Sequence, residues 1–196
     1  MRVIAGRLKG RRLKSPSWEG LRPTSDKLRE TLFNVLAPRI EGALVLDGYA
    51  GTGAIGIEAL SRGATHVTFV ESNRRAAALI AENLAACGVE GGYTVECADV
   101  VAALQARPAV GPFDLILLDP PYDLADVKAA LEHAACRVAV GGLVVLERAT
   151  RREPEVPASL RRVRDITSGD STITLFAPAV EGPGTGESLP GPGRGD

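Results

Sequence analysis

Short apolar runs alternate with helix-like segments along most of the chain, which is 196 residues long. The runs that predict strands lie at 43–47, 66–71, 93–97, 113–119 and 142–148. The segments whose apolar residues recur at helical spacing, and which therefore predict helices, lie at 54–63, 74–88, 100–106 and 124–138. The run at 113–119 is apolar enough to be buried on both faces of a sheet. Repeated strand–helix units predict a parallel sheet with helices on both faces.

The two ends of the chain break this alternation. Two strand-like runs at 160–167 and 171–177 flank a Ser-Gly-Asp turn, which predicts a hairpin added antiparallel at one edge of the sheet. Ahead of the sheet, residues 25–38 predict a helix that ends at Pro38, and residues 2–14 predict a small basic β-ribbon. The sequence therefore predicts an α/β fold with a seven-stranded, mostly parallel sheet and an N-terminal extension.

Composition excludes several classes of protein. Hydrophobic residues make up 45% of the chain and charged residues 24%, which is typical of a soluble globular protein. No apolar run has the length needed to span a membrane, and the basic N-terminus lacks the apolar core of a secretory signal. The three cysteines are scattered and there are only two histidines, so no zinc-binding pattern can be assembled. We expect reduced thiols in a cytoplasmic protein that holds no metal.

The charge is distributed unevenly. The whole chain carries −1, yet residues 1–29 hold nine Lys and Arg against two acidic residues, which places +7 there and −8 on the rest. A basic arm on an acidic body suits contact with nucleic acid or another anionic surface. We expect residues 1–38 to form a basic extension and 39–177 the main domain. Residues 178–196 are rich in Pro and Gly and predict a disordered tail.

A glycine-rich turn is the first candidate site. Gly51, Gly53 and Gly56 satisfy the pattern G-x-G-x-x-G between a predicted strand and a predicted helix. Glycines let the backbone approach a ligand, and a helix N-terminus favours an anionic group. The turn alone is compatible with a dinucleotide or with S-adenosylmethionine. The residues of this segment that we assign to a cofactor site are Asp47, Tyr49, Ala50, Gly51 and Gly53.

Acidic residues follow the next two predicted strands. Glu71 ends the second strand, where an acid can bind both hydroxyls of a ribose. Asp99 follows the third strand and can accept from an adenine amino group, while Val100 supplies a backbone donor. Asp99 fits equally well as the N-cap of the helix at 100–106. We assign Glu71, Ser72, Asp99 and Val100 to the cofactor site.

The segment Asp119-Pro120-Pro121-Tyr122 ends the fourth strand and is the predicted catalytic site. Two prolines make a stiff loop without amide donors, so its carbonyls are free to accept. Asp119 and the Pro120 carbonyl can each accept one N–H of a planar amino group. Tyr122 can stack on the ring that bears that group. A hydride-transfer enzyme has no need of such a receptor.

These groups favour methyl transfer to an exocyclic amine. The lone pair of such an amine is delocalised into its ring, and hydrogen bonds that hold both N–H groups turn it toward an incoming methyl group. The methyl of S-adenosylmethionine is already activated, so the site has to align nitrogen, carbon and sulfur. Asp119 also favours the positive charge that develops on the nitrogen. A base within folded nucleic acid would have to be flipped out of its stack.

Over residues 2–176 the sequence resembles the bacterial 16S rRNA guanine-N2 methyltransferases of the RsmD type. The segments that carry the resemblance are 2–13, 21–34, 46–64, 69–71 and 119–122. The resemblance implies a Rossmann-like S-adenosylmethionine-dependent methyltransferase fold and S-adenosylmethionine as the cofactor. It implies 16S rRNA or a small-subunit assembly particle as the partner. We further expect a monomer with no membrane association.

The resemblance also adds residues to the predicted sites. The candidates from the N-terminal extension for lining the cofactor or RNA site are Arg22, Pro23, Thr24, Ser25, Arg29 and Glu30. Of these, Thr24 and Arg29 join the cofactor site, to which Asp119 contributes as well. The predicted RNA-binding residues, which would contact phosphates, are Arg7, Lys9, Arg11, Arg12, Lys14 and Arg22. Gly48 departs from the family, which commonly has a bulkier residue there, and we expect it to loosen the loop.

Three other functions compete with this interpretation. A DNA adenine-N6 methyltransferase would use the same Asp-Pro-Pro-Tyr chemistry, but no segment is long enough for a separate DNA-reading domain. A NAD-linked oxidoreductase would use the glycine-rich turn and leave Asp119 and Tyr122 unexplained. A non-catalytic RNA-binding assembly factor would have no need of an intact Asp-Pro-Pro-Tyr segment.

Overall fold

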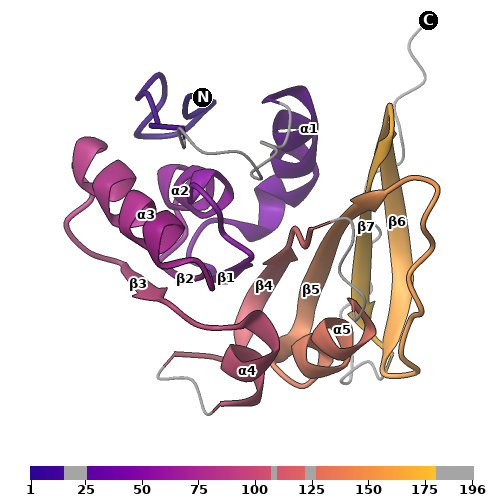
Figure 1. The fold of residues 1–196 in the computed structure, drawn as a ribbon. Coiled ribbons are helices and arrows are strands. Elements are labelled where there is room, and N and C mark those ends of the chain that lie inside the picture. Colours follow the sequence, from indigo (N-terminus) through magenta and orange to yellow (C-terminus); the bar gives the residue numbers. More distant parts are fainter. Residues whose placement is uncertain (16–25, 107–109, 122–126, 180–196) are drawn as a thin grey trace, which may run out of the picture.

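A single seven-stranded sheet organises the computed structural model, which describes residues 1–15, 26–106, 110–121 and 127–179 (Figure 1). The strands follow the order β3-β2-β1-β4-β5-β7-β6 across the sheet. They are β1 (Leu44–Gly48), β2 (His66–Val70), β3 (Tyr93–Glu96), β4 (Phe113–Leu118), β5 (Val138–Ala149), β6 (Leu160–Ser168) and β7 (Ser171–Pro178). The helices are α1 (Asp26–Leu36), the short 3-10 helix η1 (Ala37–Arg39), α2 (Ala54–Ser61), α3 (Arg74–Ala86), α4 (Val100–Gln105) and α5 (Val127–Ala135).

The strand directions confirm the predicted α/β fold. Strands β1 to β5 pair in parallel, and β7 pairs antiparallel with both β5 and β6. The second strand of the predicted hairpin therefore joins the sheet, and the first strand becomes its edge. Strand β4 lies between β1 and β5, which confirms that its apolar run is buried inside the sheet.

Helices cover both faces of the parallel half of the sheet (Figure 1). Along β4 the side chains alternate between the two faces. Leu115 and Leu117 belong to the hydrophobic cluster that contains Leu32 of α1 and Ile57 of α2. Ile116 and Leu118 belong to the second cluster, which contains residues of α4 and α5 such as Leu104 and Leu131. The sheet thus fixes the position of each strand end relative to helices on both sides.

Several predicted element ends differ from those in the structure, and strand pairing explains two of the differences. The helix predicted at 124–138 ends at Ala135, because Val138 already pairs with Phe113 at the start of β5. The chain therefore turns back at 136–137, and the first three residues of the predicted helix lie outside the described ones. At the other end of the sheet, β7 continues through Pro178, which pairs with Leu160. Of the predicted tail, residues 180–196 lie outside the described part of the chain.

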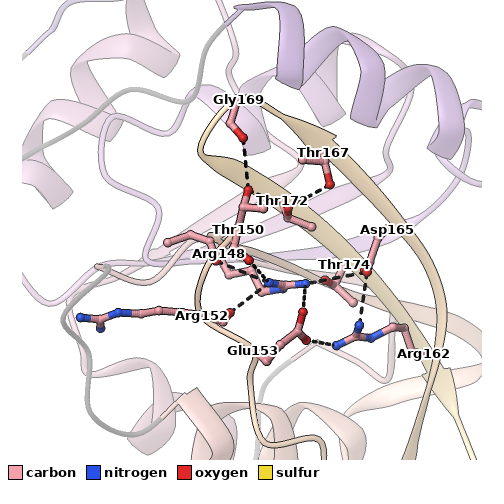
Figure 2. Close-up of polar contacts among 11 residues, drawn as sticks. Arg148, Thr150, Arg152, Glu153, Arg162, Asp165, Thr167, Gly169, Thr172 and Thr174 are labelled. Carbon is pink, nitrogen blue, oxygen red and sulfur yellow. Dashed lines mark hydrogen bonds and ion pairs between the residues drawn. The ribbon is translucent and has the colours of Figure 1, made fainter.

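A polar cluster closes the end of β5 (Figure 2). The buried Arg148 donates to Thr174 Oγ1 at 3.1 Å and to Glu153 Oε1 at 2.9 Å. Its guanidinium also donates to the carbonyls of Ala149, Thr150 and Arg152.

Arg162 on the edge strand β6 donates to both Glu153 and Asp165, which joins the hairpin to the loop that follows β5. The cluster therefore fixes the chain where it leaves β5, the strand beside β4.

The N-terminal ribbon, residues 1–14, folds back on itself, but it holds one isolated bridge and not the pair of strands that was predicted. Arg2 and Arg12 form one antiparallel bridge, and the Leu13 N–H donates to the Met1 carbonyl at 3.0 Å. Three apolar residues of the ribbon, Val3, Leu8 and Leu13, are buried in the cluster on the α1–α3 face of the sheet. The ribbon is thus part of the folded body.

Buried polar groups of α2 hold this ribbon in place. Glu58 is fully buried, and its carboxylate accepts from the backbone N–H of Ile4 at 2.7 Å and of Ala5 at 3.0 Å. Gly6 packs so closely on α2 that a Cβ there would lie 1.9 Å from the Ser61 carbonyl oxygen. Because α2 starts at the glycine-rich turn, the ribbon and that turn share one rigid support.

Across the described parts of the chain, no helix combines the length and the apolar character that a bilayer crossing would need.

Candidate active site

The carboxyl ends of β1, β2 and β4 meet at one edge of the sheet. Gly48, the last residue of β1, pairs with Val70 of β2 and with Leu118 of β4. Glu71 and Asp119 are each the next residue along their strands, so they flank the start of the Gly loop, residues 49–53. In an open α/β sheet, ligands bind in the crevice outside these strand ends. The structure therefore brings together the three segments that the sequence assigned to one site.

The Gly loop adopts a conformation that needs glycine at two positions. Gly51 and Gly53 have φ of 56° and 76°, in the left-handed region that side chains disfavour. Tyr49 also has a positive φ, 60°, which is uncommon for a residue with a side chain and costs about 1 kcal/mol. The Gly53 N–H donates to the Ala50 carbonyl at 2.7 Å, which closes the turn immediately before α2. Backbone N–H groups of the first turn of α2 thus point toward the strand edge.

Glu71 braces the Gly loop. Its Oε2 accepts from the Gly51 N–H at 2.9 Å, and its Oε1 accepts from the Asn73 N–H at 2.8 Å. The residue is buried, with 8% of its surface exposed. Each carboxylate oxygen has capacity for a second hydrogen bond. The predicted role of Glu71 toward ribose hydroxyls stays a prediction, and the contact to the loop is an additional role.

Asp47 is the most perturbed titratable group of the site. Its pKa is raised from 3.8 to about 8, chiefly by burial and to a lesser extent by the charges of Asp119 and Glu71. The Gly56 N–H, which donates to Asp47 Oδ2 at 2.8 Å, acts in the opposite direction. The three carboxyl groups lie where β1, β2 and β4 end, at one edge of the sheet. A cationic ligand there would favour the ionised form of Asp47.

We predict that Asp47 makes the stability of the ligand-free protein fall as pH rises. Between about pH 4 and pH 8 the folded protein keeps a proton on Asp47 that the unfolded chain has lost. The unfolded state then binds fewer protons, so stability decreases by up to about 1.4 kcal/mol per pH unit from this group. Asp47→Asn removes this contribution and keeps an oxygen for the Gly56 N–H. Urea unfolding at pH 5 and pH 8 measures the free energy of unfolding, which should fall more in the wild type than in the variant as the pH rises. If the two proteins differ by the same free energy at both pH values, the assignment is refuted.

Asp99 serves as the N-cap of α4. Its carboxylate accepts from the Ala102 N–H at 3.0 Å, as the structural alternative expected. The side chain is exposed, and Val100 beside it is buried. Ser72 is exposed, and its carbonyl accepts from Cys97 Sγ at 3.8 Å. The cofactor roles of Ser72, Asp99 and Val100 stay predictions.

Three of the four residues of the predicted amine-binding segment, 119–121, are among the described residues. Asp119 is half-buried, Pro120 is buried and Pro121 is exposed. The Asp119 N–H donates to the Gly48 carbonyl at 3.4 Å, which joins the segment to β1 and so to the Gly loop. Tyr122 lies outside the described residues. The position of Asp119 at the strand edge agrees with its predicted role, which the geometry alone does not test.

The predicted RNA-binding residues of the ribbon are exposed. They are Arg7, Lys9, Arg11, Arg12 and Lys14. Lys14 forms an exposed ion pair with Glu82 of α3 at 2.8 Å. Arg29, predicted for the cofactor site, is buried beneath the ribbon, where its Nη2 donates to the Arg2 carbonyl at 2.7 Å. Glu30, the remaining described candidate, is exposed on α1, and Arg22, Pro23, Thr24 and Ser25 lie outside the described residues.

Side chains of β4 and α4 pack against Gly48. A Cβ at this position would lie 2.8 Å from Leu118 Cδ2 and 3.2 Å from Val100 Cγ1. Those two side chains fill the space that a bulkier residue would take, and the expected loosening of the loop stays a prediction.

Three polar residues next to the site were not predicted from the sequence. Glu58, Ser61 and Asn83 are buried on α2 and α3 and contact the ribbon or the Gly loop. A signal was available, because Glu58 and Ser61 are polar positions in a helix that is otherwise apolar on all sides. A fully buried acid requires partners, and Glu58 finds them in Arg62, four residues on, and in two ribbon N–H groups more than fifty residues away.

Residues that could hold a metal do not cluster in the described parts of the chain. Its three cysteines are unlinked, with Cys87 buried and Cys97 and Cys136 exposed.

Residues 1–177 match the model of a family described as Conserved hypothetical protein 95. The Ribosomal RNA small subunit methyltransferase D of Escherichia coli K12 is 34% identical over 185 residues, which cover 93% of this chain and 92% of that protein. The protein of the same name from Haemophilus influenzae is 34% identical over 182 residues, which cover 90% of this chain and 93% of that protein. A solved structure from Escherichia coli, described provisionally as a methyltransferase, superposes on this chain with a TM-score of 0.81 at 33% sequence identity. The match covers 92% of this chain and 99% of that one.

Proposed function

The chain belongs to the family described as Conserved hypothetical protein 95, and we propose that it is an S-adenosylmethionine-dependent rRNA methyltransferase. We propose further that the methyl group goes to the exocyclic N2 amine of a guanine in small-subunit rRNA. Curated relatives named for small-subunit rRNA methylation, which the chain matches along almost their whole length, support the rRNA methyltransferase activity. The observation that carries it is the position of Asp119 directly after β4, beside the Gly loop and Glu71.

The residues at the strand edge fit S-adenosylmethionine. When bound, this cofactor supplies a methyl group on a positively charged sulfur, together with an adenosine and an amino-acid group. The acidic groups of Asp47, Glu71 and Asp119 suit that positive charge, and a bound cation would favour the ionised form of Asp47, whose pKa is raised chiefly by burial in the ligand-free protein. Glu71 would bind the ribose hydroxyls, and the loop at Gly51 and Gly53 lets backbone approach the ligand.

Asp119 and Pro120 would hold the target amine. Each accepts one N–H, which orients the nitrogen lone pair and fixes the reacting geometry. The carboxylate of Asp119 stabilises the positive charge that grows on the nitrogen as the new bond forms. Pro120 lacks an N–H, so its segment presents acceptors to the amine and no competing donor.

The basic ribbon would bind the phosphates of 16S rRNA or of a small-subunit assembly particle. Such contacts supply affinity and position without selecting the base. The ribbon is docked rigidly on α2, the helix that begins at the Gly loop, so it can set the distance between bound RNA and the amine site. We propose that the protein acts in the cytoplasm as a monomer and without a metal.

We expect the double variant Arg11→Ala, Arg12→Ala to bind small-subunit rRNA more weakly and with a flatter salt dependence. The slope of log K against log salt should fall by about 1 for each lost phosphate contact. Lys128→Ala on α5, which packs on the opposite face of the sheet, is the control and should keep the wild-type slope. Filter binding over a range of salt concentrations measures both; an unchanged slope in the double variant would remove the ribbon from the interface.

The activity can be tested with methyl-labelled S-adenosylmethionine and four acceptors in parallel. These are bare 16S rRNA, small-subunit particles, duplex DNA and total cellular protein. The proposal predicts label in one or both RNA-containing samples and none in DNA or protein. Label in DNA alone would favour the adenine-N6 alternative. Calorimetry that detects NADH binding and no S-adenosylmethionine binding would favour the oxidoreductase.

A further inference from the structure

Asn83 of α3 joins the Gly loop to the N-terminal ribbon. The residue is fully buried, and its side-chain amide makes three hydrogen bonds to backbone. Nδ2 donates to the Thr52 carbonyl at 3.0 Å and to the Lys14 carbonyl at 3.2 Å. Oδ1 accepts from the Lys14 N–H at 2.8 Å. Because Lys14 supplies both an N–H and a carbonyl, the orientation of the amide is fixed by its partners.

The two segments that meet at Asn83 have different assigned ligands. Thr52 lies between Gly51 and Gly53, in the loop that would approach the cofactor. Lys14 is the last basic residue of the ribbon, which would contact RNA. The positions are 31 and 69 residues from Asn83 in sequence, so only the fold brings them together. A single buried side chain is therefore hydrogen-bonded to both binding elements.

The ribbon makes further contacts to Thr52 of the Gly loop and to α2. Thr52 Oγ1 also lies 3.9 Å from Met1 Sδ at the other end of the ribbon. The Ser61 Oγ accepts from the Leu8 N–H at 2.9 Å, and Glu58 accepts from two ribbon N–H groups. The contacts of Ser61 and Glu58 reach the Gly loop only through the length of α2, whereas the contact between Thr52 and Met1 joins the loop to the ribbon directly. Asn83 is the residue among them whose own hydrogen bonds reach both the loop and the ribbon.

We propose that Asn83 is a positioning residue that links cofactor binding to RNA binding. A ligand that orders the Gly loop fixes the Thr52 carbonyl, and through Asn83 it fixes the backbone of Lys14 at the end of the ribbon. By thermodynamic reciprocity, RNA on the ribbon must tighten cofactor binding by the same factor. This inference rests on the proposed function, because it takes its two ligands from there.

The test uses S-adenosylhomocysteine, so that no methyl transfer occurs, together with small-subunit rRNA. In the wild type we expect the analogue to tighten RNA binding about 5-fold or more, at the lower end of typical allosteric coupling. Asn83→Asp keeps the shape and the acceptor for the Lys14 N–H, but its ionised form cannot donate to the two carbonyls. The coupling factor should then fall to near 1. Glu82→Gln, which removes only the exposed ion pair with Lys14, should keep the wild-type factor.

A second readout separates linkage from general destabilisation. In the wild type, S-adenosylhomocysteine alone should slow amide hydrogen exchange in the ribbon, whereas in Asn83→Asp it should slow exchange only in the Gly loop. Asn83→Ser, whose short hydroxyl cannot span both segments, serves if the aspartate variant does not fold. Equal coupling in wild type and variant, or no coupling in a wild type that binds both ligands, overturns the inference alone. A wild type that binds no S-adenosylhomocysteine overturns the proposed function and this inference with it.

Discussion

Asp119→Ala should lower the turnover number for methyl transfer by about 10²- to 10³-fold, the loss seen when one preorganised stabilising group is removed from an active site. The affinity for S-adenosylmethionine should change by less than about 5-fold. Asp119 directly follows β4, and its backbone N–H donates to the carbonyl of Gly48, the residue before the Gly loop. In our account it holds one N–H of the target amine and stabilises charge that appears only as the methyl group moves. Its removal therefore affects the transition state more than the bound ground state.

The conservative variant Asp119→Asn gives a graded control. It keeps an acceptor oxygen for the amine and loses the negative charge, so its turnover should lie between those of the wild type and Asp119→Ala. Stopped single-turnover assays measure the chemical step, and calorimetry with S-adenosylhomocysteine measures cofactor affinity. If cofactor affinity falls as much as turnover, Asp119 belongs to the cofactor site alone and the amine receptor is wrongly assigned.

Glu71→Ala should produce the opposite pattern, with cofactor affinity reduced by about 10²-fold or more. Two effects combine in this variant. Two hydrogen bonds from ribose hydroxyls to a carboxylate are worth about 1.5–3 kcal/mol each, and about 1.4 kcal/mol corresponds to tenfold in affinity. In addition, the Gly51 N–H loses the acceptor that holds the Gly loop. Turnover at saturating cofactor should fall less than affinity.

A ligand analogue separates the two effects. The wild type should discriminate between S-adenosylhomocysteine and its 2′-deoxy form, and Glu71→Ala should bind both equally weakly. Glu96→Ala is the matched control, because Glu96 ends the neighbouring strand β3 and pairs with Val70. Its cofactor affinity should equal that of the wild type. Retained discrimination in Glu71→Ala would assign Glu71 to bracing the loop and would place the ribose elsewhere.

The order of strands and helices can be predicted from this sequence because each buried strand is a short apolar run that ends in a polar or glycine residue. The run at 113–119 is apolar along both faces, and β4 is accordingly internal. Element ends are harder to predict. Val138 fits the helical spacing of the preceding segment, yet pairing with Phe113 places it in β5. Long-range pairing overrides local periodicity at that point.

Candidate ligand-binding groups could be predicted where they follow strands, and their environment could not. Glu71 and Asp119 could be predicted from their positions alone, because parallel strands bring their carboxyl ends to one edge of the sheet. The pKa of Asp47 depends on burial and on two carboxylates that only the fold brings near. Asn83 was missed because a single asparagine on a predicted helix carries no signal without its partners in the ribbon and the Gly loop.

The central claim is that Asp119 directs a methyl group onto a guanine amine of small-subunit rRNA. The most direct test treats unmethylated small-subunit rRNA and particles with methyl-deuterated S-adenosylmethionine, digests the RNA to nucleosides, and identifies the labelled nucleoside by mass spectrometry against standards. Our account predicts that the label appears in N2-methylguanosine and is absent with Asp119→Ala. Label in another nucleoside, or equal labelling by the wild type and Asp119→Ala, would contradict it.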